Sequence, residues 1–202
     1  MKLFKIDSPI MIGMTKVTDF LILNLLFIIF CIPVFTLGAA VSALYSVIFK
    51  ELKNEDVYVF KNFWQAFKVN FKQGTLVWVV FLFILVAVNI DFKIIQQGNI
   101  YGKSFLLLIL LIIDVLLFVG LLYVFPYIAK FKNTFKRTIV NAIVIGVASF
   151  PSTAMIVVFL AFCIFILVKF SVMGAIALFF FGFSGISYFT AKIFNKVFAK
   201  YY

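Results

Sequence analysis

The residues of this sequence that could do chemistry are polar side chains inside long apolar stretches, and Asp114 is the foremost. It lies ten residues after Ser104, within the apolar stretch 104–129. Ten residues of helix rise about 15 Å, which reaches the middle of a hydrocarbon layer about 30 Å thick. No lysine or arginine lies within the stretch 104–129 to offset a charge there. The position indicates either a proton- or cation-linked site or an uncharged carboxyl group that hydrogen bonds to a neighbouring helix.

Two further polar residues lie in the first apolar stretch, 17–33. Asp19 is about one helical turn from Lys16, so we expect these two side chains to interact near the end of the helix. Asn24 lies deeper, where a buried amide usually joins helices by hydrogen bonds. Asp114, Asn24 and Asp19 are therefore the candidate functional polar residues within the membrane.

Catalytic chemistry is not expected. The sequence has no histidine and only seven acidic residues, so it offers few groups for acid–base catalysis. Its two cysteines, Cys31 and Cys163, each lie in an apolar stretch and predict neither a disulfide framework nor a zinc site. No nucleophile elbow, phosphate loop or dinucleotide motif is present. We expect no catalytic residues, no metal, no cofactor and no enzymatic activity.

The elements that must position these residues are transmembrane helices. Hydrophobic residues make up 66% of the 202 residues and charged residues only 12%, which excludes a soluble globule. The sequence predicts an all-α membrane protein with a single polytopic domain over 1–202. We expect about six spans, at 17–33, 36–50, 75–95, 104–129, 152–168 and 170–191. Interfacial amphipathic helices are expected at 57–73 and 134–149, and a polar loop at 91–103.

Prolines divide two of these regions. Pro33 interrupts the first apolar stretch and Thr36 restarts it as an expected N-cap, while Pro151 divides the stretch 138–168. The segment 36–50 is shorter than the roughly 20 residues that a spanning helix needs, so it is either a short tilted span or a re-entrant helix. The stretch 17–33 is expected to be retained and not cleaved as a signal peptide.

Two surfaces are expected to pack or bind. Gly38 and Ser42, like Ala39 and Ala43, form small-xxx-small pairs, which let helices approach closely in lipid. The second surface is an aromatic face at helical spacing with lysines beside it, which is typical of a helix that lies in the membrane interface. The alternative is an amphipathic helix packed on its own protein. This face consists of Phe60, Phe63, Trp64, Phe67 and Phe71, flanked by Lys61, Lys68 and Lys72.

The basic residues predict the orientation. Six spans with both termini cytoplasmic would place three of the 18 basic residues outside, namely Lys93, Lys103 and Lys169, and the other 15 inside. The net charge of +11 then reflects contact with the lipid bilayer and not with nucleic acid, since Arg137 is the single arginine.

A short repeat relates two polar blocks. Phe60-Lys61-Asn62 with Asn70 matches Phe131-Lys132-Asn133 with Asn141 at an offset of 71 residues. Each block precedes an apolar stretch. If the repeat is structural, the chain has two related halves, as many transporters have.

An ordered set of residues in about the first 80 positions resembles the YesL family of bacterial membrane proteins. It comprises Phe4, Ser8-Pro9, Leu23-Asn24, Pro33-Val34, Thr36, Gly38-Ala39, Ala43-Leu44-Tyr45, Phe60, Phe63, Phe67, Asn70-Phe71 and Thr75. The family has no assigned activity, but its genes often lie beside carbohydrate uptake genes. The resemblance implies a role in carbohydrate utilisation at the bacterial cytoplasmic membrane, and it gives Asp114 no support.

Two functions remain open. The leading hypothesis is an accessory or scaffold protein beside a carbohydrate transport complex, with partner surfaces at the aromatic helix and at the small-residue face 38–43. The alternative is a small proton- or cation-coupled transporter that uses Asp114.

Overall fold

All regular secondary structure in the described part of the chain is helical. The computed structural model describes residues 9–53, 55, 57–98, 102–170, 174, 176 and 178–201. Within these residues there are seven α-helices and no strands, so the predicted all-α fold is confirmed. Phe4 and Ser8 of the YesL-like set lie outside the described residues, as does part of the expected span 170–191.

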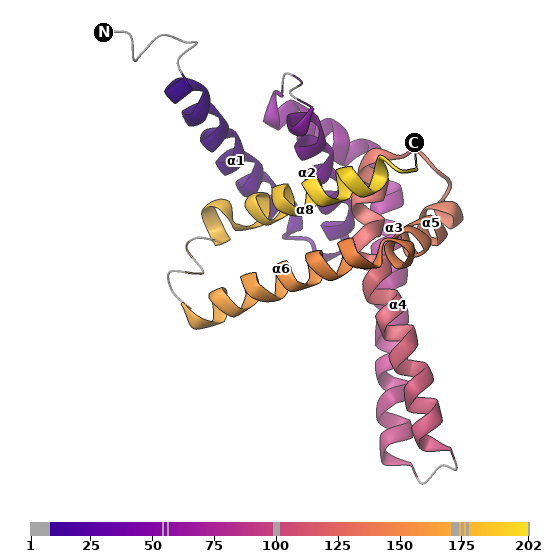
Figure 1. Ribbon diagram of the computed structural model, residues 1–202. Helices are drawn as coiled ribbons and strands as arrows, with labels where there is room; N and C mark the ends of the chain where they lie inside the picture. Colours follow the sequence, from indigo (N-terminus) through magenta and orange to yellow (C-terminus); the bar gives the residue numbers. More distant parts are fainter. Residues whose placement is uncertain are drawn as a thin grey trace.

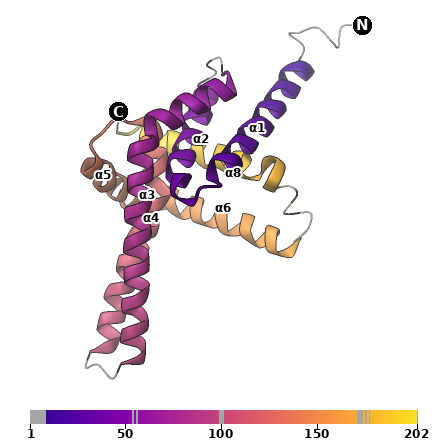
Figure 2. The same ribbon diagram turned by 180° about the vertical axis from the view of Figure 1, so that it is seen from behind.

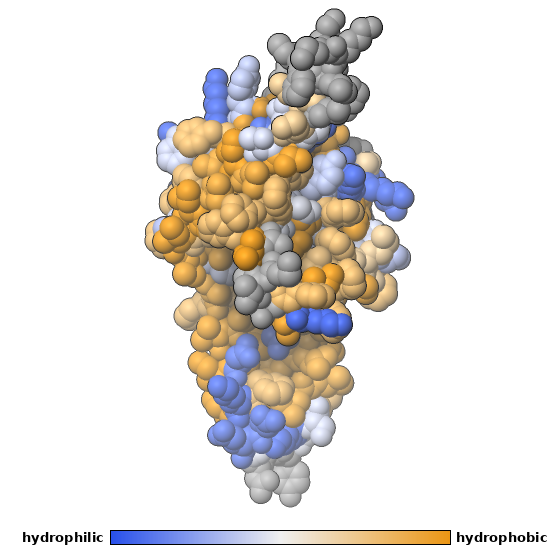
Figure 3. All heavy atoms as spheres, turned by 90° about the vertical axis from the view of Figure 1, so that its left-hand side faces the viewer, coloured by the Kyte–Doolittle hydropathy of each residue, from blue (hydrophilic) through white to orange (hydrophobic). Residues whose placement is uncertain are grey.

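Five helices are long and apolar enough to cross a membrane, judged by length and composition in the described part of the chain. They define a multi-pass membrane protein. The apolar stretches lie at Gly13–Cys31, Val34–Leu52, Val59–Gln97, Lys103–Lys130 and Phe150–Lys169. Figure 3 shows a broad hydrophobic belt between hydrophilic groups near the two ends of the visible face.

The first two helices form a hairpin. Helix α1 (Pro9–Cys31) ends before Pro33, a short 3-10 turn η1 (Val34–Thr36) reverses the chain, and α2 (Leu37–Leu52) returns beside α1 (Figure 1). Thr36 does not cap α2 through its side chain, contrary to the sequence expectation. Its hydroxyl instead donates to the carbonyls of Phe30 and Pro33, both at 2.6 Å, and so fixes the reversal.

Helix α3 (Val59–Gln97) differs most from the sequence expectation. The interfacial helix 57–73 and the span 75–95 were expected as separate elements, but they form one helix of 39 residues. Figure 2 shows this helix bending between its first part and the long part that descends beside α4. Gly74 lies where the polar composition gives way to the apolar one, and it is accommodated within the helix. The helix also continues beyond Asp91, so the expected loop 91–103 is shorter and begins at Gly98.

The remaining helices follow the predicted boundaries more closely. Helix α4 (Lys103–Lys130) corresponds to the expected span 104–129. Helix α5 (Phe135–Ala148) and helix α6 (Phe150–Lys169) are separated at Ser149, next to Pro151, as the proline predicted. A π-helix η2 (Leu178–Gly182) leads into α8 (Phe183–Phe198), which runs seven residues beyond the expected end at 191.

The core surrounds α2, which packs against α1, α3, α4 and α8. Much of its surface is buried, including Ala39, Ala43 and Leu44. Helices α4 and α8 meet in the same core, where the aromatic rings of Tyr123 and Phe194 lie edge to face with centroids 5.0 Å apart. The distal parts of α3 and α4 extend away from this core as a two-helix hairpin (Figure 1).

Candidate functional site

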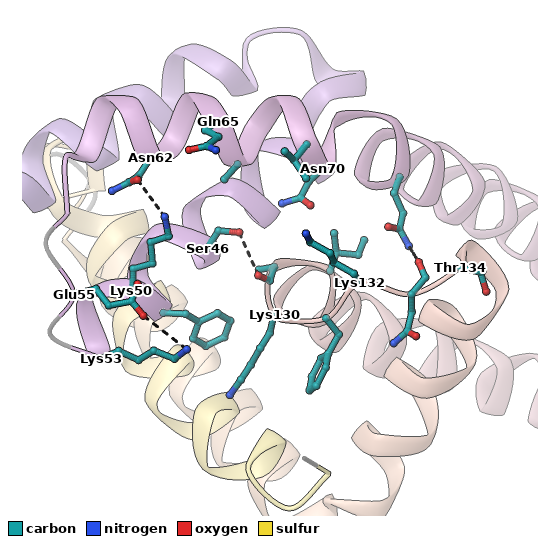
Figure 4. Close-up of a pocket in the computed structure, with 18 of the residues that line it drawn as sticks. Ser46, Lys50, Lys53, Glu55, Asn62, Gln65, Asn70, Lys130, Lys132 and Thr134 are labelled. Atoms are coloured by element: carbon teal, nitrogen blue, oxygen red, sulfur yellow. Dashed lines mark hydrogen bonds and ion pairs between the residues drawn. The ribbon is translucent and has the colours of Figure 1, made fainter.

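A polar cleft of about 880 Å³ lies between the end of α2, the first half of α3 and the connection from α4 to α5. Among the described residues, five cationic side chains, five amides and a single carboxylate line it, and Figure 4 shows most of them converging from these elements. We call it the basic cleft. Its charged and amide residues are Lys50, Lys53, Lys130, Lys132 and Arg137, then Glu55, and then Asn62, Gln65, Asn70, Gln73 and Asn133.

Two of the cations come from helix C-termini. Lys50 lies in the last turn of α2 and donates to the Asn62 amide oxygen at 3.1 Å. Lys130 ends α4 and donates to the Asn195 amide oxygen of α8 at 2.7 Å. A lysine in the last turn of a helix is stabilised by the negative end of the helix dipole. Because the acceptor of Lys50 is a neutral amide, this hydrogen bond holds its positive charge in place without compensating it.

The opposite wall is held by amide hydrogen bonds. Gln73 of α3 donates to the Asn133 backbone carbonyl at 3.1 Å and to the Thr138 hydroxyl at 2.8 Å. The Asn133 side chain donates in turn to the Tyr127 hydroxyl at 2.7 Å. These bonds join α3 to the α4–α5 connection, so the residues between Lys130 and α5 are fixed against the first half of α3.

The remaining polar residues are available to a ligand. Lys132 and Arg137 are exposed, and no described residue forms an ion pair with either. Figure 4 shows Lys132 pointing into the cleft towards the part of α3 that carries Asn70. The side chains of Gln65 and Asn70 make no hydrogen bond with other described residues. By contrast, Lys53 is partly neutralised, because it forms a 3.9 Å ion pair with Glu55.

Helix α5 also presents its N-terminus to the cleft. Thr134 is its N-cap residue and lines the cleft, but its side chain makes no capping hydrogen bond. The first N–H groups of a helix have no partner within the helix and favour an anion. The first turn of α5 contains no acidic residue that would compete for them. The arrangement can bind an anion, and no part of it suggests bond-breaking chemistry.

The three polar residues expected within the membrane lie apart from this cleft. Asp114 is half-buried on α4, and no described residue makes a hydrogen bond or ion pair with its carboxylate. The expected pairing of Asp19 with Lys16 is wrong, because Lys16 pairs with Glu51 of α2 at 3.1 Å. Asp19 and Glu51 line one small cavity between α1 and α2.

Asn24 has a more specific role than the sequence indicated. Its side chain is completely buried, and its amide donates to the carbonyls of Leu178 and Phe179 at 3.1 and 2.7 Å. Its amide oxygen accepts the Ser184 N–H at 3.0 Å. Asn24 therefore joins α1 to the π-helix η2 and to the start of α8, where the irregular backbone needs outside partners.

The small-residue face of α2 is used inside the protein. A Cβ added to Gly38 would clash with the Gly74 carbonyl oxygen and would lie 2.8 Å from the Trp78 Cβ. Ser42 is fully buried, and its hydroxyl donates to the Gly38 carbonyl at 2.9 Å. This face forms the crossing of α2 and α3 and is not available to another protein, so the expected partner surface at 38–43 is corrected.

The aromatic face of α3 is divided between core and surface. Phe63 and Phe67 are buried against Phe30 of α1, with ring centroids 5.4 and 4.7 Å apart. Phe60, Trp64 and Phe71 remain exposed and form what we call the aromatic stripe. The ammonium group of Lys68 lies 4.7 Å from the Trp64 ring centroid, and Lys61 and Lys72 are also exposed. The packing of this helix on its own protein is therefore realised for Phe63 and Phe67, while contact of the aromatic stripe with the membrane interface stays a prediction.

The short repeat gave the one sequence signal for the basic cleft. Asn62 and Asn70 of its first block and Lys132 and Asn133 of its second block line the same cleft. Asn141 instead donates to the Tyr127 hydroxyl at 2.9 Å, behind the cleft wall. The contributions of Lys50 and Arg137 had no such signal, because they become neighbours only through helix packing. Among the described residues, no three Cys, Asp or Glu side chains lie together in a way that could hold a metal ion.

The fold defines a multi-pass, all-α membrane protein, and its described part contains a polar, mainly basic cleft. Residues 20–92 match the model of a family described as "Protein of unknown function, DUF624". The matched segment includes about half of α1, all of α2 and most of α3, and so one side of the basic cleft. No curated protein and no solved structure matches the chain.

Proposed function

We propose that this protein is a non-catalytic accessory protein of the bacterial cytoplasmic membrane that acts in carbohydrate uptake or utilisation through the basic cleft. The observation that supports this proposal is the convergence of five cationic side chains and five amides from α2, α3, α4 and α5 on one open surface. Such a surface suits the binding of a polar ligand or a polar segment of a transport complex. The resemblance to the YesL family supplies the connection to carbohydrates.

The proposal includes an orientation in which the termini and the cleft face the cytoplasm. The cleft collects basic residues from both inner regions of the charge-based topology, 50–72 and 130–137. The test uses single cysteines in a background without Cys31 and Cys163. A membrane-impermeant maleimide should label Gly98→Cys and Lys169→Cys in intact cells, and Gln65→Cys and Lys132→Cys only after lysis. Labelling at Gln65 in intact cells would contradict the orientation.

The accessory role is tested by site-specific photo-crosslinking in cells grown on a sugar that induces uptake. A benzoylphenylalanine at Gln65, on the cleft rim, should form an adduct with a subunit of a carbohydrate transport system. The matched control places the same group at Gln96, near the far end of α3. Failure of Gln65 to crosslink to a transport subunit, or equal adducts at both positions, would contradict the proposal.

A second candidate function is favoured by one observation. The carboxylate of Asp114 is half-buried in an apolar helix, and no described residue hydrogen bonds to it or pairs with it. An uncompensated carboxyl group at that depth is typical of proton- or cation-coupled transport. The small transporter therefore remains the rival proposal, and substitution of Asp114 separates the two.

A further inference from the structure

We propose that the basic cleft binds a phosphate group borne by a hydroxyl-rich molecule, either a soluble sugar phosphate or the headgroup of a phospholipid. The inference rests on the proposed function only in taking this cleft as the working surface of the protein. It adds the chemical class of the ligand. The argument depends on the charge balance, the kinds of donor, and the size of the cleft.

The charge balance calls for an anion. Among the described residues that line the cleft, the single carboxylate is paired with Lys53. Lys50, Lys132 and Arg137 form no ion pair with a described residue. Lys50 is held by a neutral amide oxygen, which leaves its charge and its two other donor protons for a ligand. Because like charges repel, a cluster of this kind is stabilised when an anion occupies its centre. A neutral sugar alone would leave Lys50, Lys132 and Arg137 uncompensated by any described residue.

The kinds of donor favour phosphate among anions. Arg137 is the only arginine in the sequence, and it lines this cleft. Its planar guanidinium group can bind two phosphate oxygens at once, while Lys132 supplies a compact charge. The uncapped N-terminus of α5 adds backbone N–H donors beside Arg137. Together these groups can satisfy the three or four oxygens of a phosphate from more than one side.

The amides suit the hydroxyl groups of the ligand. Gln65 and Asn70 lie along the same wall of α3, and neither side chain is used by another described residue. An amide both donates and accepts, which matches a hydroxyl group that does the same. The cleft volume of about 880 Å³ lies within the range of small-molecule sites and exceeds what an inorganic ion needs. Space therefore remains for a polyol next to the phosphate.

The two sources of the phosphate are separated with purified full-length protein in nanodiscs. In phosphatidylcholine nanodiscs, calorimetric titration with glucose 6-phosphate tests the soluble source. Glucose tests the need for the charge, and glucuronate tests phosphate against carboxylate on a similar ring. In phosphatidylglycerol nanodiscs, native mass spectrometry of the released protein counts retained lipid. The inference predicts saturable binding in at least one of these two arms, with glucose and glucuronate at least about tenfold weaker than glucose 6-phosphate in the first.

Variants show whether the bound phosphate occupies the cleft. Arg137→Gln and Lys132→Gln should each weaken binding about tenfold, since each removes a charge-assisted contact. Lys196→Gln removes the same charge from an exposed position of α8 outside the cleft and should bind as the unchanged protein does. Thermal unfolding of every variant establishes that it is folded, and Asn70→Ala serves as a further cleft variant that keeps the charge.

Three outcomes would contradict phosphate binding in the basic cleft. Absence of binding in both arms, equal binding of glucuronate, or equal losses for Lys196→Gln and Arg137→Gln would overturn the inference. Because the purified protein is used without partners, this result is independent of the crosslinking test. Crosslinks at Gln65 without phosphate binding would leave an accessory protein whose ligand inference is wrong. Phosphate binding without crosslinks would leave a ligand site whose accessory role is wrong.

Discussion

The Asn24 side chain and the Ser184 backbone N–H, 160 residues apart in sequence, are joined by a hydrogen bond of 3.0 Å in the buried interface between α1 and the start of α8. The same amide binds two carbonyls of the π-helix η2. One side chain therefore satisfies three backbone groups that a regular helix would pair internally. In an apolar environment there is no water to hydrogen bond with these groups, so they need partners within the protein.

Replacing Asn24 should destabilise the fold through this junction. Asn24→Leu keeps a similar volume but strands the Leu178 and Phe179 carbonyls and the Ser184 N–H, which costs about 1–3 kcal/mol or more. The measurement is unfolding in mixed detergent micelles as the fraction of dodecyl sulfate rises. Asn89→Leu is the matched control, because Asn89 is exposed and bonds only to Leu85 of its own helix. Equal stability of the two variants would show that the junction contributes nothing.

The crossing of α2 and α3 predicts a second stability effect. Gly38→Ala places a methyl group within 3 Å of the Gly74 carbonyl oxygen and the Trp78 Cβ, so the two helices must separate. Overpacking of this kind costs about 1–3 kcal/mol. Gly185→Ala is the control, since an added Cβ there meets nothing within 4 Å. A lower melting temperature for Gly38→Ala alone is expected in a detergent-based thermal shift. If the control melts equally early, the close crossing is not the cause.

Five of the six expected spans coincide with helices that are long and apolar enough to cross a membrane. These helices, the hairpin at Pro33 and the division at Ser149 could be predicted from the sequence, because each depends on local composition or on a proline. The continuity of α3 could not be predicted, because a glycine such as Gly74 normally weakens a helix. Here the lack of a side chain at Gly74 allows α2 to pack closely against α3. The sequence also could not predict which rings of the aromatic face are buried and which are exposed. This division depends on Phe30, which comes from another helix and covers Phe63 and Phe67.

The basic cleft was not predicted from the sequence, although the short repeat contains part of its lining. In the sequence, its lysines are explained as charges that flank separate spans. This accounts for the number of lysines, but it does not predict that they line one cleft. Lys50, Lys132 and Arg137 come together because α2 ends where the α4–α5 connection passes the first half of α3. The salt bridge from Lys16 to Glu51 is of the same kind, since it depends on α2 lying beside α1 and not on spacing within α1.

The aromatic stripe of α3 predicts shallow contact with lipid. Phe60, Trp64 and Phe71 are exposed next to a row of lysines, which is the arrangement of a helix at the membrane interface. In a Trp78→Phe background, lipids brominated near the headgroup should quench Trp64 fluorescence more strongly than lipids brominated near the chain end.

The buried and exposed halves of this face should respond differently to polar substitution. Phe60→Ser and Phe71→Ser should shift Trp64 emission to the red with little loss of stability. Phe63→Ser should lower the melting temperature, because it removes a completely buried ring from the core. No quenching of Trp64 by either lipid would mean that the stripe is covered by another protein or faces water.

Asp114 decides between the accessory protein and the transporter. It is half-buried on α4 without a hydrogen-bonding partner among the described residues, so its removal strands no other group. If it has no role in transport, both Asp114→Asn and Asp114→Leu should keep the expression, thermal stability and sugar-dependent growth of the unchanged protein. Leu should be tolerated as well as Asn, because an apolar side chain suits an apolar helix and leaves no acceptor unpaired. A carboxyl group that must lose and regain a proton behaves differently, because neither replacement can titrate.

The deciding measurement is sugar flux driven by a pH gradient in proteoliposomes, with Asn89→Leu as a control for a polar change in an exposed helix position. We expect no gradient-dependent flux from the unchanged protein. Flux that is present in the unchanged protein and absent in a well-folded Asp114→Asn variant would replace the accessory proposal with the transporter.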